Sequence, residues 1–80
     1  MNFPIIDHPT NRPNFYKIRT DQCLYWYSYK TCIAFQSKGT LTIRENDWNV
    51  TTGKHLNFIN PDKSLRIDGD SFEQILAGVQ

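Results

Sequence analysis

Alternating apolar and polar positions predict β-strands along much of the chain. Residues 15–20 alternate, with Tyr16 and Ile18 on one face, at the period of two that a half-buried strand requires. Residues 23–29 are rich in aromatic side chains, which suit a pleated surface. Further strand-like runs follow at 32–36, 40–45 and 64–68, and Leu65 and Ile67 of the last are expected to face inward. We therefore expect a four- or five-stranded, mainly antiparallel sheet.

Turn-forming residues separate the expected strands. The Ser-Lys-Gly segment at 37–39 is typical of a three-residue hairpin loop, with a glycine available for a positive φ. An earlier turn is expected near Lys30. That turn would bring Cys23 opposite a residue near Gln36 and not opposite Cys32, whereas bridged cysteines need Cα atoms within about 7 Å. We therefore favour two buried thiols over a disulfide.

Two helices are predicted in the C-terminal half. The first covers residues 53–59, with Thr51 or Thr52 as its N-cap, because a threonine hydroxyl can accept from the first free amides. The second is indicated by four apolar residues at i, i+3, i+4 and i+7, and Asp70 or Ser71 is its expected cap. The four residues are Phe72, Ile75, Leu76 and Val79. The predicted fold class is therefore α+β, with a short helix after strand four and a C-terminal helix packed on one face of the sheet.

The first 14 residues form a separate extended arm. Prolines at positions 4, 9 and 13 each lack an N–H and restrict the residue before them, which argues against a helix or a central strand. Phe3, Ile5 and Ile6 are apolar enough to dock the arm on its own domain or on a second copy of the chain. Residues 15–80 then make a single α+β domain, as a chain of 80 residues allows. A homo-oligomer would use the arm or an exposed sheet edge.

Charge and composition limit the classes of partner and the cellular locations that we expect for this protein. Nine basic and eight acidic residues are interspersed and give a net charge of +1, which weakens a nucleic-acid reading because phosphate affinity needs clustered cations. No apolar run approaches the roughly 20 residues of a spanning helix, so we expect no membrane insertion. The N-terminal residues MNFPIID carry no secretory leader, and the two cysteines form no CxxC pair, so a reducing cytoplasm is the expected location.

The candidate chemistry is concentrated in residues 48–59, WNVTTGKHLNFI. Thr51, Thr52 and Lys54 could hold a phosphate or carboxylate at the positive end of a helix, and the alternative is a capped helix with a solvated lysine. His55 is a candidate base or metal ligand, although such a histidine more often anchors a helix. No HExxH, P-loop or GxSxG pattern occurs, so we expect no metal, no cofactor and no catalysis.

Aromatic and basic residues suggest a second kind of surface. Such mixtures stack the bases of a single-stranded nucleic acid and follow its phosphates. The residues concerned are Tyr25, Tyr27, Tyr29 and Trp48, beside Lys17, Lys30 and Arg44.

Two short patterns between residues 27 and 57 resemble a known group. The first, SYKTCIAF, fits Ser-Tyr-x-Thr-x-Val/Ile-Ala, and the second, NVTTGKHLN, fits Thr-Thr-x-Lys/Arg-His. The matching residues are Ser28, Tyr29, Thr31, Ile33 and Ala34, then Thr51, Thr52, Lys54 and His55. Together these motifs resemble a family of small uncharacterised phage and plasmid proteins, in which proline usually stands where this chain has Cys32. The resemblance implies a phage or mobile-element origin and supplies no activity.

If the two motifs meet in space, they form either a hydrogen-bonded joint between sheet and helix or a shared site, and we favour the joint. The function expected is a non-catalytic interaction module that binds a host or phage macromolecule, with a protein as the favoured partner. The alternatives are single-stranded nucleic-acid binding and small-anion binding at the helix start. The candidate binding residues are Trp48, Thr51, Thr52, Lys54, His55, Tyr27, Tyr29 and Arg44.

Overall fold

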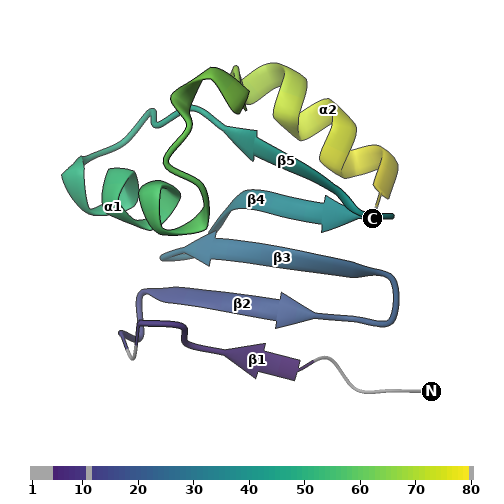
Figure 1. Cartoon of the computed structure of the whole chain (residues 1–80), viewed down its shortest axis with the longest axis horizontal. Coiled ribbons are helices and arrows are strands. Elements are labelled where there is room, and N and C mark those ends of the chain that lie inside the picture. Colours follow the sequence, from purple (N-terminus) through teal and green to yellow (C-terminus); the bar gives the residue numbers. More distant parts are fainter. Residues whose placement is uncertain (1–4, 11, 80) are drawn as a thin grey trace.

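The computed structural model describes residues 5–10 and 12–79 and contains one six-stranded sheet (Figure 1). The strands lie in chain order: β1 (Ile5–Asp7), β2 (Phe15–Arg19), β3 (Cys23–Ser28), β4 (Thr31–Ser37), β5 (Thr40–Arg44) and β6 (Arg66–Ile67). The first five pair antiparallel, and β6 pairs parallel with β5. The α+β class and the mainly antiparallel sheet are therefore confirmed.

The sheet has more strands than predicted, and its last strand is shorter than predicted. Within the proline-rich arm, Ile5–Asp7 pairs with β2 at the edge of the sheet, where one side of the strand needs no N–H partner. Phe3 and Pro4 of the same arm lie outside the described residues. The expected strand at 64–68 is a 3-10 turn at Lys63–Leu65 followed by the two residues of β6. Leu65, expected to point inward, is 49% exposed.

Both helices begin earlier than predicted because asparagine and aspartate side chains bind their first turns. Helix α1 (Val50–Ile59) is capped by Asn49, whose Oδ1 accepts from the Thr52 amide at 2.9 Å. Helix α2 (Gly69–Val79) is preceded by Asp68, whose carboxylate accepts from the Ser71 amide at 2.9 Å. The expected threonine cap of α1 and the expected Asp70 or Ser71 cap of α2 are therefore wrong.

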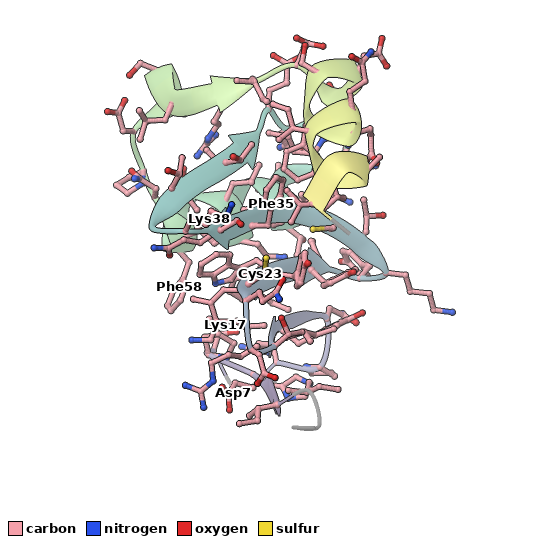
Figure 2. All side chains as sticks on the ribbon, turned by 90° about the vertical axis from the view of Figure 1, so that its right-hand side faces the viewer. Asp7, Lys17, Cys23, Phe35, Lys38 and Phe58 are labelled. Carbon is pink, nitrogen blue, oxygen red and sulfur yellow. The ribbon has the colours of Figure 1, made fainter. Side chains whose placement is uncertain are left out.

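The two helices pack on opposite faces of the sheet and create two buried clusters. On one face Leu56 of α1 joins four residues of the sheet and its flanks: Phe15, Ile33, Ala34 and Ile43. On the other face Phe72 and Leu76 of α2 pack on Cys32 and Phe35. Figure 2 shows Phe35 beside α2 and Phe58 of α1 away from it. The predicted apolar stripe of α2 is buried at Phe72 and Leu76, whereas Ile75 is 46% exposed.

Strand β4 supplies side chains to both clusters, and a bulge in its pairing with β3 places two adjacent residues on the same face. Trp26 lies opposite Ala34 while Tyr27 lies opposite Cys32, so Ile33 is the extra residue. The bulge turns both Ile33 and Ala34 toward α1, and Cys32 and Phe35 remain on the α2 side.

Two tight turns flank β4. The turn after β4 is one residue shorter than predicted, and the turn before β4 lies where it was predicted. Ser37 still pairs with Thr40, so the loop comprises only Lys38 and Gly39, which both have positive φ (53° and 80°) as a type I′ turn requires. The turn near Lys30 is confirmed, since Ser28 pairs with Thr31.

The cysteines are free thiols, as predicted from the strand register. Cys23 lies opposite Ser37, and Cys32 lies opposite Tyr27. Burial raises the pKa of Cys32 to about 12, which keeps this thiol protonated and unreactive at neutral pH.

Candidate functional site

A buried hydrogen-bonded joint connects the end of β3 to α1. Ser28 Oγ lies 2.7 Å from His55 Nδ1 and 3.1 Å from Thr52 Oγ1. All three residues are buried, with exposed fractions of 3%, 8% and 2% for Ser28, His55 and Thr52. Thr52 and His55 reach the same serine because they are three positions apart on one helix face. The two sequence motifs therefore meet, and the contact runs through Ser28.

The His55 ring is fixed by stacking as well as by its hydrogen bond. It lies parallel to the Phe15 ring, with centroids 4.5 Å apart and an interplanar angle of 7°, and 6.4 Å from the Tyr29 ring. Burial lowers the pKa of His55 below its usual 6.5, so the imidazole is neutral at neutral pH. Since Nδ1 is engaged by Ser28, Nε2 is the nitrogen left for any ligand.

The serine and histidine stand at the distance of a nucleophile and its base. However, Ser28 is 3% exposed, and its hydroxyl also bonds Thr52. The arrangement therefore orients the histidine ring and joins helix to sheet.

A cleft of about 500 Å³ opens beside this joint, between the loop after β1 and α1. Its volume is within the range of roughly 300–1,000 Å³ that is typical of ligand sites. Half of the lining comes from one face of α1, at i, i+3, i+4 and i+7. The lining residues are Thr51, Lys54, His55 and Phe58 of α1, with Thr10, Arg12, Asn14 and Tyr29.

The lining of this cleft is basic and aromatic. Arg12 and Lys54 are its charged members, and neither forms an ion pair or a side-chain hydrogen bond with a described residue. Thr10 Oγ1 is buried and has no hydrogen-bond partner among the described residues. Tyr29 and Phe58 are 44% and 55% exposed. The cleft therefore presents uncompensated positive charge next to apolar rings.

A smaller hollow of about 220 Å³ lies on the other side of Tyr29. Its lining residues are Ser28, Tyr29, Thr31, Trp48, Asn49 and Thr52. Tyr29 belongs to both hollows and is held by an unusual backbone, with φ at 59° and its N–H donating to the Asn14 carbonyl at 2.6 Å. A left-handed backbone conformation is uncommon at a tyrosine, so contacts with the surrounding structure hold Tyr29 in this conformation.

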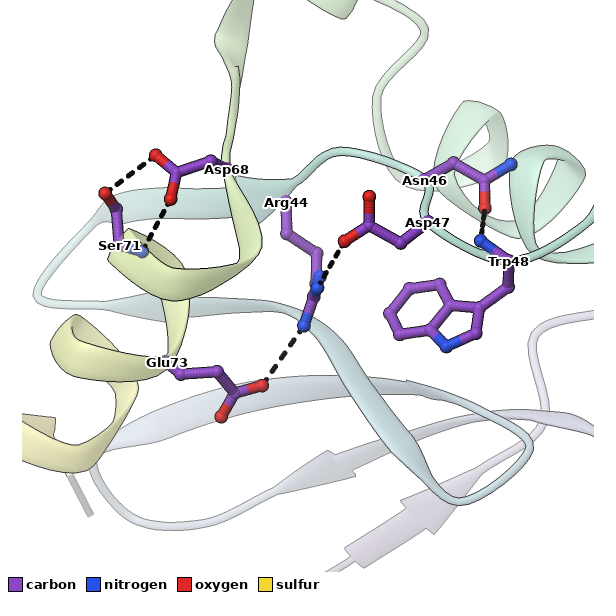
Figure 3. Close-up of polar contacts among 7 residues, drawn as sticks. All are labelled: Arg44, Asn46, Asp47, Trp48, Asp68, Ser71 and Glu73. Carbon is purple, nitrogen blue, oxygen red and sulfur yellow. Dashed lines mark hydrogen bonds and ion pairs between the residues drawn. The ribbon is translucent and has the colours of Figure 1, made fainter.

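Arg44, a predicted binding residue, is buried between the sheet and α2 (Figure 3). Its guanidinium donates to Asp47 at 2.8 Å and to Glu73 at 3.1 Å, and it lies over the rings of Trp48 (4.5 Å) and Phe72 (5.7 Å). These contacts join β5, the loop before α1, and α2. The Arg44 charge is therefore already compensated, whereas the Trp48 indole remains 44% exposed.

The predicted aromatic and basic surface is divided between the two faces of the sheet. Tyr27 stacks on Tyr16 at 5.2 Å and, like Tyr25, packs on the cluster under α2. Lys17 pairs with Trp26, whose side chain lies on the α1 face. Burial raises the pKa of Tyr25 to about 12 and raises that of Tyr27. The strand tyrosines and Lys17 therefore do not form one stacking surface.

Several residues of the two hollows were not predicted as site residues. Phe58 lies one turn beyond Lys54, so the predicted helix over residues 53–59 already placed both on one face, and this spacing could have identified Phe58. Arg12 and Asn14 belong to the arm, and only the folded structure brings them to α1. Among the described residues, no group of three His, Cys, Asp or Glu side chains could hold a metal ion.

No helix of the described residues is long and apolar enough to cross a bilayer.

No curated protein and no solved structure gives a significant match to the chain. A family model described as a family of unknown function (DUF8033) matches residues 6–74, which include every strand but the first residue of β1, all of α1, and the first half of α2. The chain therefore belongs to this family of unknown function.

Proposed function

We propose that this protein is a non-catalytic interaction module of a phage or mobile element, which binds a host or phage protein through the surface around Trp48. The observation that supports this proposal is an exposed apolar group at the start of α1. Tyr29 and Trp48 are each 44% exposed and line the smaller hollow, and Val50, next to Asn49 of that hollow, is 75% exposed.

The surface around Trp48 has the properties of a protein-binding surface. Tyrosine and tryptophan are enriched at interface centres because they bury a large area at a small cost in side-chain entropy. The surface is also pre-organised, since the Ser28 joint fixes α1 and the Arg44 ion pairs fix the loop that carries Trp48. A rigid surface loses less entropy on binding than a mobile one.

The buried polar groups support a non-catalytic role. Ser28 and His55, the pair closest to a catalytic arrangement, bond each other and Thr52 away from solvent. Catalysis would need a nucleophile or base that a substrate can reach. The residues best placed for chemistry thus hold the structure together.

Site-specific photo-crosslinking in cells tests the proposal. A photo-reactive phenylalanine analogue replaces Trp48 in one variant and Leu65, which is 49% exposed on the 3-10 turn, in a matched control. We expect a discrete, protease-sensitive and nuclease-resistant adduct from position 48 and none from position 65. A nuclease-sensitive adduct, or the same adducts from both positions, would show that the proposal is wrong.

A further inference from the structure

Apart from Tyr29, the cleft between the loop after β1 and α1 is not used by the proposed protein contact, and its chemistry indicates a different ligand. Arg12 and Lys54 reach it from two separate parts of the chain, and none of the described residues that line it is Asp or Glu. Two cations without acidic partners favour an anion, because each loses solvent on closure and gains a charge-assisted hydrogen bond only from a negative group.

The number of donors favours a phosphate over a single carboxylate. Besides the guanidinium and the ammonium, the cleft offers the hydroxyl of Thr51 and the side-chain amide of Asn14. A phosphate monoester carries close to two negative charges at neutral pH and has three terminal oxygens that accept hydrogen bonds. It therefore matches both cations and leaves an oxygen for a neutral donor.

The apolar part of the cleft favours a ligand in which a planar group is attached to the phosphate. A phosphate alone occupies only part of a space of about 500 Å³, and the remainder is bordered by the half-exposed rings of Tyr29 and Phe58. Phe58 is held by an edge contact with Phe15 at 5.6 Å. Aromatic side chains of this kind stack on nucleobases of any sequence.

Neutral polar groups complete the cleft. His55 lines it and bonds Ser28 through Nδ1 alone, and Thr10 Oγ1 is buried without a partner among the described residues. Such groups can bond a sugar hydroxyl or a base edge without adding charge. We propose that this cleft binds a nucleotide, with the phosphate between Arg12 and Lys54 and the base against Tyr29 and Phe58.

The same chemistry can come from a free nucleoside monophosphate or from one nucleotide of a single strand, and a titration separates the two. Backbone amide NMR shifts of the whole chain are followed with adenosine 5′-monophosphate, inorganic phosphate, adenosine and a hexadeoxyadenylate. We expect saturable shifts at Thr51, Lys54 and Phe58 with the monophosphate, and at least about tenfold weaker binding of phosphate or adenosine alone. Binding of the hexanucleotide that is more than about tenfold tighter identifies a strand as the source, and weaker or equal binding identifies the free nucleotide.

Matched charge variants decide whether the cleft is responsible. Arg12→Gln and Lys54→Gln alter exposed side chains, so the fold should persist, and each should weaken monophosphate binding about tenfold. Lys38→Gln removes the same charge from the turn at the other end of β4 and should leave the affinity unchanged. The proposal is overturned if no saturable shift occurs below about 5 mM, or if Lys38→Gln weakens binding as much as Lys54→Gln. Either result leaves the Trp48 crosslink, and hence the proposed function, unaffected.

Discussion

Replacing Ser28 with alanine tests whether the joint between β3 and α1 stabilises the fold. The change removes two hydrogen bonds, at 2.7 Å to His55 and at 3.1 Å to Thr52, without adding volume. Both partners are over nine-tenths buried, so water does not replace the serine hydroxyl. A buried polar group left without its partner costs about 1–2 kcal/mol, which gives about 2–4 kcal/mol for the two groups.

That loss is large for a chain of this length. Domains are stable by about 5–15 kcal/mol, and 1 kcal/mol shifts the melting temperature of an 80-residue domain by about 4–8 °C. Ser28→Ala should therefore lower the melting temperature by about 10–25 °C. In urea, the midpoint should fall while the slope of the transition stays constant, because the folded structure remains equally compact.

Ser37→Ala is the matched control for Ser28→Ala. Ser37 lies at the opposite end of β4, is half-buried, and makes no side-chain hydrogen bond with a described residue. Its replacement should change the free energy of unfolding by no more than about 0.5 kcal/mol. A loss below about 1 kcal/mol for Ser28→Ala, or equal losses for the two variants, would refute the structural role assigned to the joint.

Two further predictions concern Arg44 and the pH dependence of stability. Gly69→Ala would place a methyl group against the Arg44 guanidinium and should destabilise the fold by about 1–3 kcal/mol. The control Gly78→Ala, whose new methyl group meets no neighbouring atom within 4 Å, should raise stability by up to about 1 kcal/mol. Equal melting temperatures for the two variants would contradict the role assigned to Gly69. The free energy of unfolding should fall as the pH drops below 6.5, because His55 in the unfolded chain takes up a proton before the buried imidazole does. It should also fall above pH 10, because unfolded Tyr25 releases its proton there and the folded residue keeps its own until about pH 12. Urea midpoints that stay constant through both pH ranges would show that burial does not perturb these groups.

Local patterns predicted most of the fold because its main elements follow from side-chain periodicity. The alternation in residues 15–20 predicted strand β2, although Phe15 is its fully buried residue and Tyr16 and Ile18 are only partly buried. The apolar stripe of α2 is buried at Phe72 and Leu76 as expected. The errors arose where a single side chain decides a boundary. Asn49 and Asp68 bind the first amides of the two helices, and nothing in the apolar spacing distinguishes them from the neighbouring candidates.

The site was less predictable because it depends on contacts between distant residues. The second motif and Ser28 meet because the hairpins β3–β4 and β4–β5 reverse the chain twice, so that α1 begins at the end of the sheet where β3 ends. Arg12 and Lys54 line the same cleft only once the loop between β1 and β2 lies beside α1. The spacing of residues along the sequence does not show which distant residues will meet in the folded chain. Composition therefore suggested one aromatic and basic sheet face, whereas the alternation of β2 and β3 places these residues on two opposite faces.

The order of the strands in the sheet favours stepwise folding of the chain. Strands β1 to β5 each pair with the next one in sequence, so every antiparallel contact closes a short loop. Only β6 reaches its partner across α1, as the parallel pair with β5. Short loops close at little entropic cost, and folds built from them form rapidly. The five-stranded meander can thus assemble hairpin by hairpin during synthesis, and the segment from α1 to α2 then completes both cores.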